Sequence, residues 1–276
     1  MRDYVVSVVI GLLDGVTDFI PVSSGAHLRI AEALLQIRLS GTFWALYLIL
    51  AHLGAVSAVL LLYAQQLRAA DRMSDNAAKA GRGLVTTSPL TIGIAFLTGS
   101  LCRYAICYLT NRAEAGLSAL GAALVAGGAA MWMSDVLADG KAVRKRPTLT
   151  GALLIGVCDS IGAIFPGFSH AMLTITSGEL AGLTRLSAVE FSFLLFVPNM
   201  LMESFSEMYS IARAGKNTEL AVPHEVAMLA IGFCTSAAGA YFAAVWMLKR
   251  SQTQSLLGPA LYRICLGLIL IVWMSR

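Results

Sequence analysis

The sequence predicts an all-α integral membrane protein with six transmembrane helices, two re-entrant helical hairpins and an inverted-topology repeat. The first observation is composition: of 276 residues, 57% are hydrophobic and only 13% are charged, whereas soluble domains are about one-quarter charged. The second is six apolar runs of the length, about 20 residues, that a helix needs to cross a bilayer. The third is a pair of apolar runs that are interrupted midway. Residues 1–276 are expected to form a single membrane domain.

The six expected spans are uninterrupted and apolar, and they cover residues 42–63, 90–110, 115–137, 187–208, 226–247 and 258–275. The net charge of +4 comes from basic residues in the short segments between these runs. This distribution does not form the continuous basic surface that nucleic-acid binding requires. The sequence therefore predicts a protein that works within the lipid bilayer and binds no nucleic acid.

Two further stretches, residues 4–36 and 149–182, contain Pro, Gly, Ser and His at their centres. Each is expected to form two half-length helices joined by a polar break. Half-length helices do not cross a bilayer, and irregular backbone at membrane depth is tolerated only where it is buried in protein or lines a cavity. Both stretches are therefore predicted to be re-entrant hairpins.

Basic residues predict the orientation of the chain, because excess Lys and Arg marks cytoplasmic loops. The loops 64–83 and 139–148 are basic, and Lys249, Arg250 and Arg263 are expected to mark a third basic loop. With the predicted spans, all three loops fall on one face. Both chain ends then lie outside, and the first hairpin dips in from the outer face.

Residues 4–137 and 149–275 each contain one hairpin followed by three spans, so the second copy is inverted relative to the first. Asp14 lies seven residues before Pro21 and Asp159 seven before Pro166, and Ser24 and Ser169 each follow the respective proline by three. Inverted repeats with broken helices commonly build a polar site near the bilayer midplane.

The break in the first hairpin carries most of the candidate chemistry. Asp14 and Asp18 are four residues apart and share a helix face, and Pro21 then ends the helix. The hydroxyls of Ser23 and Ser24 and the imidazole of His27 follow at once. Two acids at a helix end could simply be solvated, but ionisable groups at membrane depth are functional candidates by default.

Residues 11–28 read Gly-Leu-Leu-Asp-Gly-Val-Thr-Asp-Phe-Ile-Pro-Val-Ser-Ser-Gly-Ala-His-Leu, and residues 165–175 read Phe-Pro-Gly-Phe-Ser-His-Ala-Met-Leu-Thr-Ile. Together with residues 182–198, these segments resemble the motifs of the undecaprenyl pyrophosphate phosphatase, or bacitracin-resistance, family. The resemblance extends over essentially the whole chain. It implies a bacterial inner-membrane enzyme that hydrolyses a polyprenyl diphosphate lipid to the monophosphate and inorganic phosphate. That reaction recycles the cell-wall lipid carrier and gives resistance to bacitracin.

The matching positions imply a set of site residues. Diphosphate hydrolysis needs anion contacts, charge neutralisation and an in-line nucleophile. Asp14 and Asp18 are expected to hold a divalent cation, Mg²⁺ or Ca²⁺, since both ions prefer oxygen ligands. Ser169 is the candidate nucleophile, and His27 is the expected proton carrier. Contacts to the substrate phosphates are expected from Ser23, Ser24, Gly25, Gly167, His170 and Thr174.

The chain departs from the family motifs at several positions. Both motif glutamates are aspartates here, and the threonine after the paired serines is Gly25. His170 stands where the second motif has arginine, and Ala171 and Met172 replace the following Ser-Gly. Histidine lacks the always-charged fork with which arginine grips phosphate at two points. His170 is therefore expected to replace that arginine only weakly.

Several alternatives remain open from the sequence. An inverted repeat with broken helices also suits a polyprenyl-phosphate transporter or flippase. A third interpretation is a homologue with weakened or lost catalysis that binds lipid or partner helices. A homodimer is compatible with the sequence. The serines and threonine could be helix caps or back-bonding hydroxyls, His52 reads as a core histidine, and Asp159 as a relic of Asp14 or a partner for Arg103.

Overall fold

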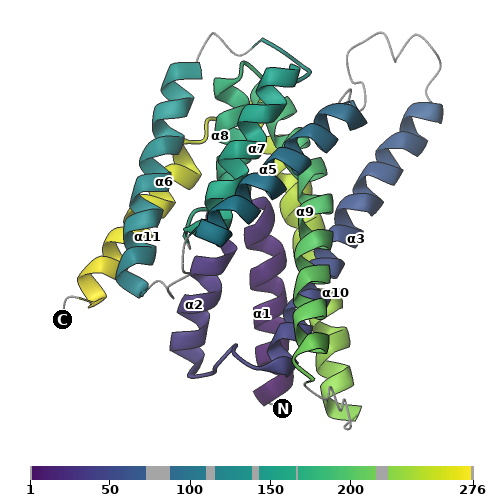
Figure 1. Cartoon of the computed structure of the whole chain (residues 1–276), viewed down its shortest axis with the longest axis vertical. Coiled ribbons are helices and arrows are strands. Elements are labelled where there is room, and N and C mark those ends of the chain that lie inside the picture. The colour runs from purple at the N-terminus through teal and green to yellow at the C-terminus, as the bar shows by residue number, and fades with distance from the viewer. Residues whose placement is uncertain are drawn as a thin grey trace.

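A computed structural model describes residues 2–72, 88–109, 116–138, 143–165, 167–215 and 223–274. The described regular structure is α-helical (Figure 1). The helices are α1 (Arg2–Phe19), α2 (Ser24–Leu35), α3 (Thr42–Arg72), α5 (Pro89–Leu109), α6 (Leu117–Ala138), α7 (Leu149–Ile164), α8 (His170–Leu180), α9 (Arg185–Arg213), α10 (Pro223–Arg250) and α11 (Leu257–Met274). Pro166 and the loop residues Lys79, Arg82, Arg112, Lys141 and Lys216 lie outside the described residues.

Five described helices are long and apolar enough to cross a membrane, namely α3, α5, α6, α9 and α10. They coincide with five of the six expected spans, so the prediction of an all-α, multi-pass membrane protein is confirmed. The sixth expected span corresponds to α11, which, like α7, is a shorter apolar helix. The total of six spans stays a prediction.

Both interrupted stretches form broken helices at the expected places. Ser23 lies between α1 and α2 with a φ of 79°, and its Oγ accepts a hydrogen bond of 3.3 Å from the Ala26 N–H. Ser169 lies between α7 and α8, and its Oγ accepts from the Met172 N–H at 3.4 Å. In Figure 1, α2 lies in the lower part of the molecule and α8 in the upper part. Each break therefore places a serine at the start of a helix that leads away from the molecule's centre.

The packing pairs helices from the two halves of the chain. Helix α1 packs along α10, α7 packs along α5, and α6 packs along α11, while α3 contacts both α9 and α10. Small residues allow close approach: a Cβ on Gly156 would overlap the Ala95 backbone, and one on Gly15 the Ser236 backbone. Helices of the first half thus pack mainly against helices of the second half. The repeat of residues 4–137 and 149–275 itself stays a prediction.

The placement of Arg263 in a basic loop was wrong. Helix α11 begins at Leu257, so Arg263 lies within the helix, and it is fully buried. Its Nη1 donates to the Pro21 carbonyl at 3.3 Å, and its Nη2 donates to the Gly167 carbonyl at 2.9 Å. Broken helices leave carbonyl groups without helical partners, and this guanidinium satisfies one from each hairpin. Arg263 therefore ties the two breaks together.

Gly167 gives a test of this junction. Its φ is 102°, and a Cβ there would lie 2.8 Å from the Ala123 Cβ and 3.0 Å from the Leu120 carbonyl oxygen. Gly167→Ala is expected to destabilise the protein by about 1–3 kcal/mol, measured as a lower Tm in detergent. The control is Gly25→Ala, because a Cβ at Gly25 meets nothing within 4 Å. Equal Tm values for the two variants would contradict the strained turn.

Candidate active site

A cavity of about 250 Å³ lies between the two helix breaks. Eight of the ten expected site residues line it: Asp14, Asp18, Ser23, Ser24, Gly25, Gly167, Ser169 and His170. The rest of the lining comes from α2, α3, α7, α8, α9 and the second break, namely Leu28, Leu48, His52, Gly162, Phe168, Ala171, Phe196, Met200 and Glu203. The cavity thus combines polar groups of both hairpins with an apolar wall.

The carboxylates of the first hairpin have buried oxygens without hydrogen-bond donors. Asp14 is 0% exposed, and neither of its carboxylate oxygens has a hydrogen-bond partner among the described residues. The same holds for Oδ2 of Asp18. Burying a charge without a partner costs several kcal/mol. The two carboxylates therefore create a strong local demand for positive charge.

His52 is the nearest described positive candidate. Its Nε2 lies 3.5 Å from Oδ1 of Asp14, and one ligand atom from each of Asp14, Asp18 and His52 falls within 4.8 Å of the others. The two carboxylates offer the oxygen ligands that Mg²⁺ and Ca²⁺ prefer, and the imidazole converges on the same point. Interpreting His52 as a core histidine missed its contact with Asp14. The signal that could have found it is an ionisable side chain within an apolar span.

His27 does not line the cavity. Its Nδ1 lies 2.7 Å from the Ser23 carbonyl oxygen, and its Nε2 lies 2.7 Å from the Tyr262 hydroxyl. The two rings are stacked, with centroids 5.7 Å apart and planes 8° apart. Both ring nitrogens are therefore engaged, and Nε2 fastens α2 to α11. This geometry argues against the predicted role of His27 as proton carrier.

The hydroxyl groups differ in how they are used. Ser23 Oγ serves as the cap of α2, whereas the Ser24 hydroxyl interacts with the Asp18 carboxylate. Ser169 Oγ accepts a long cap contact of 3.4 Å from the Met172 N–H, and no described residue accepts a hydrogen bond from it. Thr174 lies outside this cavity, where its Oγ1 contacts Ser192 Oγ at 2.6 Å. Ser169 is thus the hydroxyl of the second hairpin that faces the cavity.

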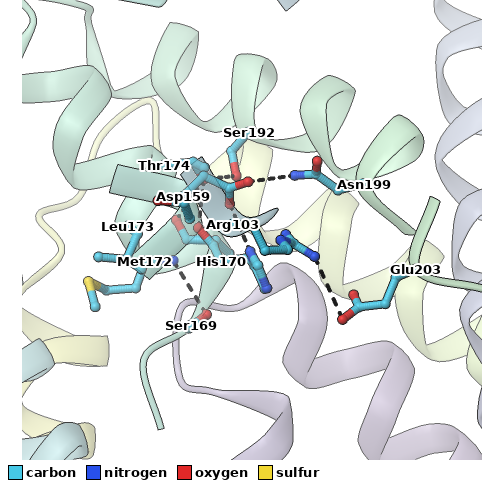
Figure 2. A network of polar contacts seen from close by, with 12 residues as sticks. Arg103, Asp159, Ser169, His170, Met172, Leu173, Thr174, Ser192, Asn199 and Glu203 are labelled. Atoms are coloured by element: carbon cyan, nitrogen blue, oxygen red, sulfur yellow. Dashed lines mark hydrogen bonds and ion pairs between the residues drawn. The ribbon is translucent and has the colours of Figure 1, made fainter. Parts of the chain in front are cut away.

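His170 is held by a buried carboxylate (Figure 2). Its Nδ1 lies 2.8 Å from Oδ1 of Asp159, and Asn199 Nδ2 donates to Oδ2 of Asp159 at 2.7 Å. The interpretation of Asp159 as a partner of Arg103 was wrong, because Arg103 instead lies 3.8 Å from Glu203. His170 therefore belongs to a hydrogen-bonded chain and is not a free substitute for a guanidinium.

The chain is similar to proteins of one known family. The family model described as "Bacitracin resistance protein BacA" matches residues 7–269. The chain is 33% identical to an undecaprenyl-diphosphatase of Koribacter versatilis, over 99% of both chains. It is 30% identical to an undecaprenyl-diphosphatase of Rhizobium etli, over 98% of this chain and 96% of that one. It is 27% identical to undecaprenyl-diphosphatase 1 of Frankia alni, over 96% and 93% respectively. The chain therefore belongs to the bacitracin resistance protein BacA family.

Proposed function

We propose that this protein hydrolyses undecaprenyl diphosphate to undecaprenyl monophosphate and inorganic phosphate. It does so in the bacterial inner membrane, where the reaction recycles the cell-wall lipid carrier and gives resistance to bacitracin. The observation that carries the proposal is the meeting of Asp14, Asp18, Ser24, Ser169 and His170 in one cavity between two broken helices. The names of the related proteins support the same reaction.

The cavity suits a diphosphate joined to a hydrocarbon chain. Helices α2 and α8 both begin at the cavity, and helix N-termini attract anions through their free N–H groups and dipoles. Two such ends face a substrate with two phosphate groups. Leu28, Leu48, Phe196 and Met200 supply apolar wall for the first part of the prenyl chain. The headgroup is thus bound by backbone N–H groups while the lipid remains in apolar surroundings.

Asp14 and Asp18 would repel this substrate unless a cation lay between them. Their unpartnered oxygens, together with His52, would hold Mg²⁺ or Ca²⁺. The bound ion would neutralise charge on the phosphate oxygens.

Ser169 is the proposed nucleophile. A bond forms between its Oγ and the terminal phosphorus, and the bond from that phosphorus to the bridging oxygen breaks. The prenyl monophosphate leaves with the electron pair. Water then attacks the phosphoserine, which releases inorganic phosphate and restores the Ser169 hydroxyl. In-line attack of this kind depends mainly on positioning and charge stabilisation.

The test is release of inorganic phosphate from undecaprenyl diphosphate by the purified protein in detergent. Ser169→Ala is expected to lower kcat by about 100-fold or more. The matched control is Ser177→Ala on the same helix, because Ser177 Oγ donates to the Leu173 and Thr174 carbonyls at 2.6 and 3.3 Å and the residue lies outside the cavity. Full activity in Ser169→Ala would exclude Ser169 as nucleophile. If labelled prenyl phosphate crossed the proteoliposome membrane and no phosphate was released, the result would favour the flippase alternative over hydrolysis.

The two histidines of the first half are expected to separate clearly. His52→Gln is expected to lower kcat by about 10- to 100-fold, because it removes either a ligand of the cation or the charge partner of Asp14. His27→Gln is expected to lower Tm and leave kcat within about threefold, since His27 fastens α2 to Tyr262. The measurement is kcat and Tm for both variants. A larger kcat loss in His27→Gln would return the proton-carrier role to His27.

A further inference from the structure

We propose that His170 is the proton carrier of this site and that Asp159 is the residue that positions it, with Asn199 holding Asp159 in place. The proposal rests on the proposed hydrolysis and assigns the proton transfer within it. It gives a function to a buried carboxylate of the second hairpin that lies outside the main cavity lining.

The geometry begins with a carboxylate that is locked at both oxygens. Asp159 is on α7 and only 1% exposed. Its Oδ1 lies 2.8 Å from His170 Nδ1, and its Oδ2 accepts from Asn199 Nδ2 at 2.7 Å. The three side chains come from α7, α8 and α9 and meet in a row, as Figure 2 shows. Three helices thus fix the orientation of one imidazole.

The chemistry follows from this contact. An ionised carboxylate can only accept hydrogen bonds, so Nδ1 of His170 must carry a proton. Nε2 is then the nitrogen that gains and loses a proton, as in other carboxylate–histidine pairs. No described residue is hydrogen-bonded to Nε2, and His170 lines the cavity directly beside Ser169. His170 therefore presents a proton-accepting atom to the site.

The other histidines are already committed. His27 uses both ring nitrogens outside the cavity, and His224 lies 3.3 Å from Asp3 near the start of α1. His52 lies 3.5 Å from Oδ1 of Asp14. The chain has four histidines, and this leaves His170 as the one beside the candidate nucleophile.

Each proton that moves in the two steps has a donor and an acceptor. As the bond between Ser169 Oγ and phosphorus forms, the hydroxyl proton moves to His170 Nε2, and Asp159 stabilises the resulting imidazolium. When water attacks the phosphoserine, the bond between Oγ and phosphorus breaks and the imidazolium returns its proton to Oγ. Both hydrogens of the water leave with the inorganic phosphate. Serine and neutral imidazole are then restored.

The pairing also explains why a histidine is useful at this position. A guanidinium would bind phosphate at two points but could not accept a proton. If residue 170 were only a phosphate clamp, an arginine would serve at least as well, and the buried Asp159–Asn199 pair would have no purpose in catalysis. Of the nearby charged groups, Arg103 lies 3.8 Å from Glu203, and Asp18 lines the same small neighbouring cavity as Asp159 and His170.

The experiment is a double-mutant cycle with kcat and KM measured for undecaprenyl diphosphate. Asp159→Asn and His170→Gln are each expected to lower kcat by about 100-fold or more while KM changes by less than about threefold. The double variant is expected to be no slower than His170→Gln alone, because Asp159 acts through His170. Asn199→Ala is expected to give a smaller loss of kcat in the same direction.

The matched control is Glu179→Gln. Glu179 is also a buried acid, it pairs with Arg185 at 2.7 Å, and it lies outside the cavity. Its variant is expected to lower Tm and leave kcat unchanged. An equal further loss when Asp159→Asn is added to His170→Gln would overturn the positioning role. A gain in kcat in His170→Arg would overturn the proton role in favour of phosphate clamping. A wild type that releases no phosphate would instead count against the proposed function itself.

Discussion

Asp14→Asn and Asp18→Asn are each expected to lower kcat for phosphate release by about 10²- to 10³-fold, while leaving the cation-free protein at least as stable as the wild type. Both carboxylates have buried oxygens without hydrogen-bond donors. An amide removes the buried charge and the mutual repulsion, so stability without cation rises or holds. The loss of a cation ligand affects only the complex in which a bound cation neutralises the charges. These opposite effects on rate and on stability are expected when an amide replaces a carboxylate whose function is to bind a cation.

The measurement is Tm with and without Mg²⁺ or Ca²⁺, alongside kcat. An ion at 100 times its Kd raises stability by about 2.7 kcal/mol, so the wild type is expected to gain Tm and the two variants to gain little. Asp3→Asn, on the same helix but exposed, is the matched control and should retain both the ion response and the activity. An equal rise in Tm in the wild type and in an Asp14→Asn, Asp18→Asn double variant would exclude these ligands.

Arg263→Met is expected to be the most destabilising single change considered. The guanidinium is fully buried and donates to the Pro21 and Gly167 carbonyls, one from each hairpin. Each buried acceptor left without a donor costs about 1–3 kcal/mol. Because the two breaks also frame the cavity, a shift near 1 Å between them can cost about 100-fold in rate. Arg263→Met should therefore lower both Tm and kcat, whereas changes at a single catalytic group lower kcat alone.

The control for this prediction is Arg29→Met. Arg29 forms an exposed pair with Glu32 on α2 at 3.3 Å, and exposed pairs contribute about 0–1 kcal/mol. Arg263→Lys is a second test, because one ammonium group replaces the two nitrogens that now reach separate carbonyls. Wild-type Tm in Arg263→Met would show that the two hairpins do not depend on this bridge.

Local sequence patterns predicted the parts of the site that local structure determines. The spacing of Asp14 and Asp18 places them on one helix face, and prolines and serines mark the breaks that put Ser24 and Ser169 at helix starts. These features depend on helix geometry and capping within a few residues. Five of the spans could also be predicted from the sequence, because hydropathy over a window of about 20 residues reflects the lipid environment directly.

Contacts between distant segments were the parts that the sequence did not reveal. His52 meets Asp14 only because α3 packs near the first hairpin, and Asn199 meets Asp159 only because α7 and α9 both pack against α8. His27 turns toward Tyr262, a partner 235 residues away. The prediction from charge distribution placed Arg263 in a loop. It failed because the burial of Arg263 depends on carbonyl groups that become available only where both hairpins break. Side-chain direction thus required the tertiary structure.

The central claim is that both hairpins contribute to one diphosphate site, and a structure with a non-hydrolysable prenyl diphosphonate bound would test it most directly. The phosphonate oxygens are expected within hydrogen-bond distance of residues 24–25 at the start of α2 and of residues 169–170 at the start of α8. An analogue that contacts only one hairpin, or that binds beside Arg103 with the cavity between the breaks left unfilled, would contradict the account.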